Sequence, residues 1–310
     1  MSSPTIAASE AGLAARPRSW RFGDTVLTRI VESEGPLLSP FEVLPDCTQA
    51  QLDENMSWLA PRFYDPSARA LVITIQSFLI RSGGRTILLD ACGGNHKQRR
   101  RPFFHQRQWN WLAALRAAGV GPQDVDIVMC SHLHVDHVGW NTRLENGRWV
   151  PTFPNARYLV SRREWAYWRS EAGIKSLDRT GDFISDSLLP IVERGQADMI
   201  EDRHVLSDCV EIEPAHGHTP GHFVVRLSGG GREAVLSGDL LHTPLQLRYP
   251  DWSTRFCVDP EMARQTRRRF LARHCDSELL IFPAHFPSPT GGRVRRDGDH
   301  YRFEFDTADS

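Results

Sequence analysis

Histidine and aspartate residues are concentrated in one short segment, directly after an apolar run. The segment Ser-His-Leu-His-Val-Asp-His holds four potential metal ligands: His132, His134, Asp136 and His137. Imidazole nitrogen and carboxylate oxygen suit zinc, manganese, iron or cobalt. In an extended segment His132 and His134 point the same way and can reach one ion, and after a turn Asp136 and His137 can face a second. This density of ligands disfavours the alternative of a histidine-rich surface loop.

Three further ligand candidates occur later in the chain, each after an apolar, strand-like run. His218 lies in the turn Gly-His-Thr-Pro-Gly-His, Asp239 follows Ala-Val-Leu-Ser-Gly, and His285 follows Leu-Leu-Ile-Phe-Pro-Ala. Loops at strand ends can direct such side chains into a shared cleft. His216 and His222 flank His218, and we expect them to support the site or to pack within strands rather than to bind metal.

The order of these motifs resembles that of the metallo-β-lactamase fold superfamily over about residues 70–290, and Asp90 matches an early strand-end aspartate of that superfamily. The resemblance implies an α/β fold, a four-layer αββα sandwich with two mixed β-sheets and the metals at one edge between them. It also implies two bound divalent ions. The first would be held by His132, His134 and His218, the second by Asp136, His137 and His285, with Asp239 as the bridge.

Two groups within this superfamily compete for the closer resemblance. N-acyl homoserine lactonases carry a tyrosine three residues after the bridging aspartate, where this chain has His242. The segment from Gly238 to His242, the later Gln246 and the C-terminal region are more similar to the methyl parathion hydrolase group, which acts on phosphotriesters and often on esters or lactones. His242 either hydrogen-bonds the substrate oxygen or braces the site. The residues expected to take part in catalysis are Asp136, Asp239 and His242.

The expected chemistry is hydrolysis of a small molecule by a hydroxide held between two cations, which lower the pKa of a shared water to about 7. The bond cleaved would belong to an ester, a lactone or a phosphotriester. Zn²⁺ is the expected metal, with Mn²⁺, Fe²⁺ and Co²⁺ left open. The alternatives are an N-acyl homoserine lactonase active in quorum quenching, a hydrolytic dehalogenase of activated aromatic rings and a sulfur dioxygenase with one iron.

The elements that position these residues are expected to be a mixture of strands and helices. Strands are predicted at 26–31, 72–80, 86–90, 126–130, 157–160, 210–212, 222–227, 234–237, 279–282 and 301–305, and helices at 109–118, 162–171 and 260–274. For the last helix Asp259 is the predicted N-cap, with Pro260 in the first helical position. Residues 1–20 are interpreted as a flexible arm and 21–310 as a single hydrolase domain.

The composition is that of an ordinary globular protein. The chain carries 37 Lys and Arg against 38 Asp and Glu, so its formal charge of −1 gives no reason to expect nucleic acid or an anionic membrane as a partner. Six scattered cysteines without a CxxC pair, no secretory signal and no run of roughly 18 apolar residues indicate a cytoplasmic protein. We expect a small-molecule substrate and a homodimer.

Side chains close to the metal loops are candidates for the substrate pocket. Four aromatic residues could line it: Phe103, Phe104, Trp109 and Trp140. For Trp109 a position in the helix core is favoured, and for Trp140 both places remain open. Two basic runs, at 97–101 and 267–269, are interpreted as solvated charge, although the first could attract an anionic substrate.

Overall fold

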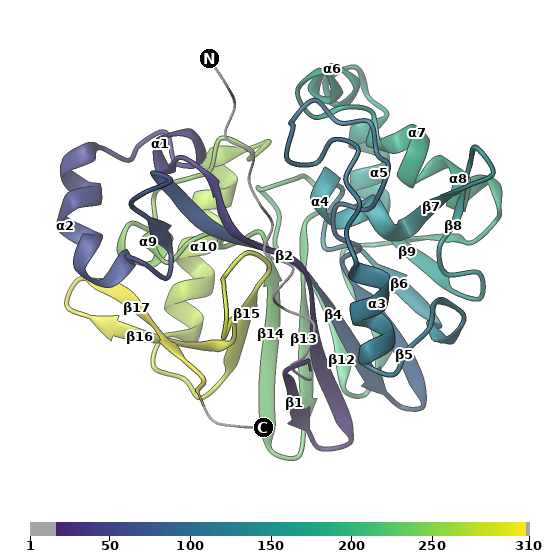
Figure 1. Ribbon diagram of the computed structural model, residues 1–310. Coiled ribbons are helices and arrows are strands. Elements are labelled where there is room, and N and C mark those ends of the chain that lie inside the picture. The colour runs from purple at the N-terminus through teal and green to yellow at the C-terminus, as the bar shows by residue number, and fades with distance from the viewer. Residues whose placement is uncertain (1–16, 308–310) are drawn as a thin grey trace.

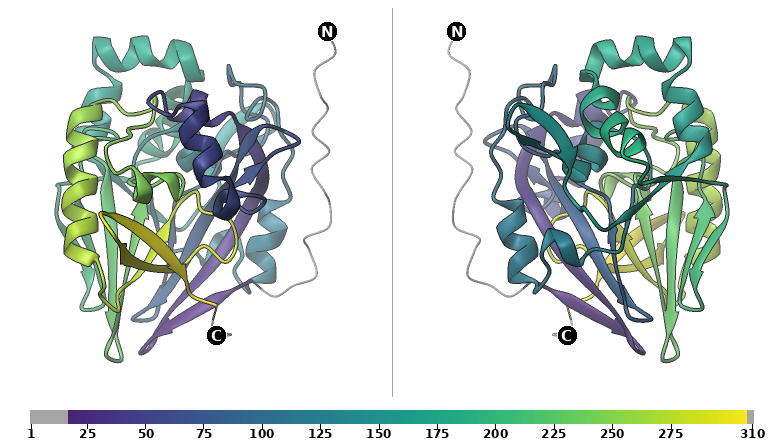
Figure 2. Two further views of the ribbon diagram at one scale, coloured as in Figure 1. Left: turned by 90° about the vertical axis from the view of Figure 1, so that its left-hand side faces the viewer. Right: turned by 90° about the vertical axis from the view of Figure 1, so that its right-hand side faces the viewer.

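Two large mixed β-sheets pack face to face in the computed structural model, which describes residues 17–307 (Figure 1). Figure 2 shows α10 (Pro260–His274) on the outer side of one sheet and α3 (Trp111–Ala117) on the outer side of the other. The layers therefore follow the order helix, sheet, sheet, helix. The predicted α/β class and the αββα sandwich with two mixed sheets are confirmed.

The first sheet has eight strands in the order β1-β2-β4-β5-β6-β9-β10, with β3 beside β4. Their bounds are β1 (Ser19–Phe22), β2 (Thr25–Leu38), β3 (Tyr64–Asp65), β4 (Ala70–Ser82), β5 (Arg85–Leu89), β6 (Ile127–Met129), β9 (Arg157–Ser161) and β10 (Ala197–Ile200). The β4–β5 hairpin turns at Gly83 and Gly84, whose positive φ angles suit glycine. The neighbouring strands β5, β6, β9 and β10 run parallel to one another. Strand β6, which precedes the histidine cluster, lies between β5 and β9 and is therefore inside the sheet.

The second sheet has seven strands in chain order. They are β11 (His204–Ser207), β12 (Val210–Pro214), β13 (Phe223–Gly229), β14 (Arg232–Gly238), β15 (Leu280–Pro283), β16 (Gly292–Asp297) and β17 (His300–Phe305). All pairs are antiparallel except β14–β15, which are parallel because a long connection containing α9 (Leu245–Arg248) and α10 separates them. A separate hairpin is formed by β7 (Thr142–Glu145) and β8 (Arg148–Pro151).

Apolar side chains of both sheets fill the space between them. Trp20 and Phe78 of the first sheet meet Phe282 of the second, with ring centroids 4.7 and 6.0 Å apart in edge-on geometry. All three side chains are buried. This contact holds the sheets in a fixed relation, so residues at the end of either sheet can contribute to one site.

The helices lie in the connections. Besides α3, α9 and α10 they are α1 (Pro40–Val43), α2 (Gln49–Leu59), α4 (Val135–Val138), α5 (Arg162–Trp168), α6 (Glu171–Thr180), α7 (Phe183–Ser187) and α8 (Leu189–Glu193). Helix α10 has its predicted bounds, and the Asp259 side chain accepts the backbone N–H of Met262. The helix predicted at 162–171 ends early because Ser170 caps a new helix, accepting the N–H of Gly173.

Residues 1–16 of the predicted N-terminal arm lie outside the described residues. Ser19 and Trp20 form part of β1, and the Trp20 indole N–H donates to Asp306 Oδ2 at 3.0 Å. Within the described residues the fold therefore starts before residue 21, because Trp20 is buried between the sheets. The six cysteines are all free, as expected. None of the helices described here is long and apolar enough to cross a membrane.

Candidate metal centre

The seven predicted ligands meet at one edge of the two sheets. The first sheet contributes His132 and His134 after β6 and Asp136 and His137 on α4; the second contributes His218 between β12 and β13, Asp239 after β14 and His285 after β15. Their ligand atoms form groups that could hold metal ions: His132, His134, His218 and Asp239; Asp136, His137 and His285; and Asp239, His242 and His285. The structure thus brings together every residue that the motifs singled out.

Asp239 lies between two groups of histidines. Its Oδ2 atom is 3.2 Å from Nε2 of His218 and 3.6 Å from Nε2 of His132. Its Oδ1 atom is 3.2 Å from Nε2 of His137 and 3.0 Å from Nε2 of His285. One carboxylate therefore presents an oxygen to each group, which is the geometry that a bridging ligand requires.

Three ring nitrogens converge in the first group. Nδ1 of His134 lies 2.9 Å from Nε2 of His132 and 3.0 Å from Nε2 of His218. Burial lowers the pKa of His132 and of His134 well below the usual range for histidine. Both rings are therefore neutral, and a neutral imidazole retains a lone pair for a cation.

Several buried polar atoms at this point have no hydrogen-bond partner among the described residues. They include both ring nitrogens of His137, both ring nitrogens of His242 and Oδ1 of Asp239, whose short contacts with neighbouring groups lack hydrogen-bond geometry. Such atoms are costly to bury unless something satisfies them. Divalent cations would do so, and imidazole nitrogen with carboxylate oxygen is a donor set that zinc and related metals accept. The residues present therefore fit the metal pair that the motifs imply.

Hydrogen bonds from behind orient the candidate ligands. Nδ1–H of His285 donates to the carbonyl oxygen of Thr74 at 2.9 Å, which leaves Nε2 facing the site. His222 donates through Nδ1–H to the carbonyl of Ala215 at 2.9 Å, and its Nε2 accepts the backbone N–H of Asp239 at 3.0 Å. His222 therefore supports the site, as expected. Partners of this kind fix the tautomer and direction of metal-binding histidines.

Asp90 supports the histidine segment from the end of β5. Its Oδ1 atom accepts the backbone N–H of Ser131 at 2.7 Å. Its Oδ2 atom lies 3.0 Å from Nδ1 of His137. Asp90 thus contacts the candidate ligand segment without belonging to the ligand groups, which is the supporting role that the motif resemblance implies.

Glu164 is a buried acid near the site that sequence reasoning missed. Its Oε2 atom accepts the backbone N–H of Leu133 at 2.9 Å and the indole N–H of Trp168 at 2.9 Å, and Oε1 accepts the backbone N–H of Gly221 at 2.6 Å. The signal available was its place three residues after Ser161, the N-cap of α5. That spacing is typical of a capping box, but here the carboxylate contacts the metal loops.

Glu32 is a half-buried acid that the motifs did not reveal. Its carboxylate accepts the backbone N–H groups of Gly93 and Gly94 at 2.9 and 3.0 Å and the indole N–H of Trp140 at 2.7 Å. Burial raises its pKa to about 7, although these hydrogen bonds act in the opposite direction. A Cβ atom at Gly139 would lie 2.0 Å from the carbonyl oxygen of Gly93, so only glycine allows the two loops to meet.

His242 faces the cavity above the metal centre. Its Nε2 atom is 3.1 Å from Oδ2 of Asp239, and its ring stacks on His285 with centroids 5.2 Å apart. Burial lowers its pKa to about 3, so the ring is neutral. The backbone N–H of His242 donates to Oε1 of Gln246 at 2.8 Å, and Gln246 in turn donates to the carbonyl of Trp252. The turn that presents His242 is therefore held in place.

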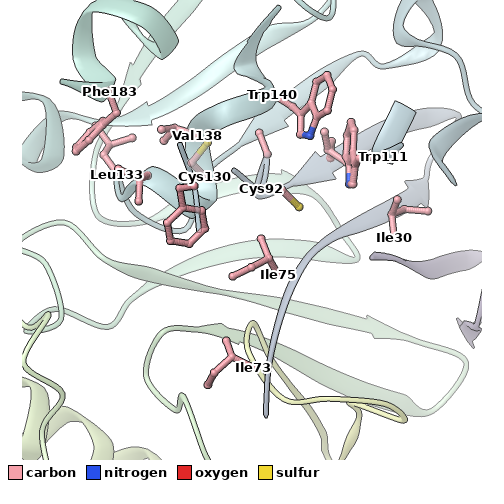
Figure 3. Close-up of a cluster of buried hydrophobic side chains, with 14 of the residues drawn as sticks. Ile30, Ile73, Ile75, Cys92, Trp111, Cys130, Leu133, Val138, Trp140 and Phe183 are labelled. Carbon is pink, nitrogen blue, oxygen red and sulfur yellow. The ribbon is translucent and has the colours of Figure 1, made fainter. Parts of the chain in front are cut away.

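A cavity of about 310 Å³ lies over this group of residues. Its walls are mainly apolar and include Leu37, Leu38, Val43, Ile73, Ile75, Phe104, Val135, Trp168, Phe256 and Val258. Of the four aromatic residues predicted to line a pocket, Phe104 does so. Trp140 instead stacks on Trp111 at 5.4 Å within the core (Figure 3), and Trp109 packs against Phe103 at 5.7 Å.

The interpretation of both basic runs as solvated charge is wrong at specific positions. Lys97 is fully buried and donates to Oγ1 of Thr142 at 2.6 Å, and the buried Arg99 donates to Oδ1 of Asp186 at 2.8 Å. Arg101 lines the cavity.

In the second run Arg267 is buried and donates to the carbonyl oxygens of Leu240 and Pro250 at 2.9 and 2.8 Å. As with Lys97 and Arg99, acceptors from distant segments make this burial possible. The residues adjacent in sequence do not indicate which distant segments supply these acceptors.

Sequence comparison gives one family and a set of partial relatives. The profile of the Metallo-beta-lactamase superfamily matches residues 72–300. The N-acyl homoserine lactonase AttM of Azorhizobium caulinodans is 33% identical over 133 residues, which cover 39% of this chain and 43% of AttM. The N-acyl homoserine lactonase AiiB of Agrobacterium fabrum is 28% identical over 110 residues, covering 30% and 40%. The chain thus spans less than half the length of these relatives.

Solved structures share the fold over nearly the whole chain. The hydrolase AbOPH of the beta lactamase superfamily superposes with a TM-score of 0.78 at 23% identity, covering 94% of this chain and 99% of that one. AidC, a dizinc quorum-quenching lactonase in complex with a product N-hexanoyl-L-homoserine, superposes with a TM-score of 0.76 at 20% identity, covering 94% and 98%. At these identities the likeness establishes the architecture.

Proposed function

The chain belongs to the metallo-beta-lactamase superfamily and is a hydrolase of that fold, and on this premise we propose that it uses two divalent metal ions to open a lactone or cleave a carboxylic ester of a small molecule. The observation that carries the proposal is the Asp239 carboxylate, whose two oxygens each face a different group of histidines. The relatives named as N-acyl homoserine lactonases support the lactone class.

The ligand roles follow from these groups. We assign the first ion to His132, His134 and His218, the second to Asp136, His137 and His285, and the bridge to Asp239. Zinc is the proposed metal because the donors are imidazole nitrogens and carboxylate oxygens.

When bound, two such cations supply a strongly activated water and polarise the scissile carbonyl. The chain's own residues do the rest. The apolar walls at Ile73, Ile75 and Phe104 exclude bulk water from the reacting atoms. His242 is neutral, lines the cavity and has no hydrogen-bond partner at its Nδ1 atom among the described residues, so it is placed to hydrogen-bond the substrate oxygen. The Gln246 contact keeps the His242 turn in that position.

The proposal is tested on purified protein by elemental analysis combined with a substrate panel of N-acyl homoserine lactone, aryl ester and phosphotriester. We expect about two metal equivalents per chain and lactone or ester hydrolysis that is lost on chelation and restored by Zn²⁺. One iron and no hydrolysis would support a dioxygenase instead. Chloride release from an activated aryl chloride would support a dehalogenase. Phosphotriester turnover that exceeds lactone and ester turnover would identify phosphotriesters as the preferred substrate class. Hydrolysis that survives complete metal removal contradicts the proposal.

A further inference from the structure

Three arginines line the cavity over the metal centre, although its walls are otherwise mainly apolar. They come from three separate segments: Arg101 from the loop after β5, Arg179 from α6 and Arg255 from the loop before α10. Figure 1 shows α1, α4 and α6 at the same end of the molecule. An apolar cavity that gathers three cations from distant parts of the chain needs an explanation in terms of what it binds.

The cavity arginines are only partly neutralised by the protein. Nη1 of Arg101 is 2.7 Å from Oε1 of Glu42, and Nη1 of Arg255 is 3.8 Å from the same oxygen. Arg179 forms no ion pair among residues 17–307. The single carboxylate of Glu42 therefore pairs with two of the three arginines, and the three positive charges exceed this one negative charge by two. The two acids that line the cavity, Asp136 and Asp239, belong to the proposed metal centre.

The surroundings favour recognition of an anion. The Arg101 guanidinium lies over the ring of Phe256, 5.6 Å from its centroid, and 32% of its side chain is exposed. Apolar walls next to a partly buried cation lower the effective dielectric and strengthen its attraction for a negative charge. Guanidinium groups bind carboxylates through paired hydrogen bonds, which a neutral amide cannot match.

We propose that the cavity selects substrates that carry a carboxylate, or a comparable anionic group, on an apolar stem away from the bond to be cleaved, and that Arg101 and Arg255 recognise this group. The inference rests on the proposed hydrolase function and narrows its substrate class. The apolar residues Leu37, Ile73 and Phe104 would contact the stem. Arg179 lines the same cavity and adds to its positive potential.

The test compares two aryl esters of one linear diacid. Both have the same scissile bond; one ends in the free carboxylate and the other in the primary amide. For the metal-loaded wild type we expect kcat/KM to be about tenfold higher for the carboxylate ester. Added salt should reduce this ratio, because it screens partly exposed charges.

Substitutions assign the effect to residues. Arg101→Gln and Arg255→Gln should each raise KM for the anionic ester severalfold, with little change in kcat and in the turnover of the amide ester. Arg268→Gln is the matched control, because Arg268 lies on α10, pairs with Asp251 and does not line the cavity. Equal kcat/KM values of the wild type for both esters, or a ratio that neither cavity variant changes, would overturn the inference and leave the hydrolase function intact.

A binding measurement separates the two proposals. The corresponding anilides are not cleaved readily, and calorimetry can compare the carboxylate and carboxamide forms on wild type and variants. Tighter binding of the carboxylate form that is lost in Arg101→Gln and Arg255→Gln supports the anion site, even if the esters are not hydrolysed and the hydrolase proposal fails. Carboxylate binding that is the same in wild type and both variants overturns it.

Discussion

The carboxylate of Glu164 accepts the backbone N–H of Gly221 at 2.6 Å. Gly221 belongs to the turn that carries His218, and the other oxygen of Glu164 accepts the N–H of Leu133, between His132 and His134. One buried side chain thus joins two ligand loops that are 88 positions apart, counting from Leu133 to Gly221. The relative position of the three histidines of the first group depends on this link.

Replacing Glu164 with Gln should therefore weaken metal binding. The amide has a single oxygen, so its NH₂ group must face one of the backbone N–H donors. We expect about tenfold weaker metal affinity and a loss of about 1–3 kcal/mol in the free energy of unfolding. Chelator competition and urea unfolding measure the two effects. Glu193→Gln, on the exposed end of α8, is the control and should change neither. Wild-type affinity in Glu164→Gln would contradict this positioning role.

Asp239→Asn tests the proposed bridge. The amide retains the size of the side chain but loses its charge and one of the two oxygens that face the histidine groups. We expect metal content to fall from about two equivalents toward one or none, and turnover to fall by at least about a hundredfold. Elemental analysis and initial rates check this. Unchanged stoichiometry together with an unchanged rate would remove Asp239 from the centre.

His242→Tyr tests how this position influences substrate choice. The resembled lactonases carry tyrosine here, and the His242 ring borders the cavity beside Asp239. We expect the ratio of lactone to phosphotriester turnover to rise, because a phenol can donate to the lactone oxygen. His242→Phe supplies the ring without the hydroxyl and should not raise the ratio. If both variants respond alike, side-chain size rather than hydrogen bonding is responsible.

Lys97→Met should change how stability depends on pH. Burial lowers the pKa of Lys97 from 10.5 to about 7, with Asp186 acting in the opposite direction. Between these values the unfolded chain binds the extra proton, so the free energy of unfolding of the wild type should rise with pH across this window. The methionine variant lacks this titration. Relative to the variant, the wild type should gain up to a few kcal/mol between about pH 7 and about pH 10, measured by urea unfolding. If the free energies of unfolding of the wild type and the variant changed with pH in parallel, the lowered pKa of Lys97 would be refuted.

The strands and metal ligands were predictable because their signals are local. The apolar runs before His132, Asp239 and His285 are strands β6, β14 and β15, and each ligand follows the end of its strand. The edge strand β1 and the short helices α7 and α8 were missed, since four or five residues carry little periodicity.

The supporting carboxylates could not be found in this way. Glu32 and Glu164 are single acids in ordinary sequence, and their partners are backbone N–H groups that only the folded chain brings near. The burial of Lys97 and Arg267 depends likewise on acceptors from remote segments. Composition of a basic run cannot distinguish such residues from Arg101, which lines the cavity.

The division of ligands between the two sheets has a consequence for the stability and abundance of the protein in a cell. His132 and His134 follow a strand of one sheet, whereas His218 and Asp239 belong to the other. Under the proposed assignment a shared cation ties the two halves together, and its binding adds to stability in proportion to the logarithm of free metal over Kd. Chains made under metal starvation would open more often and be degraded sooner. Metal supply would thus set the abundance of this protein as well as its activity.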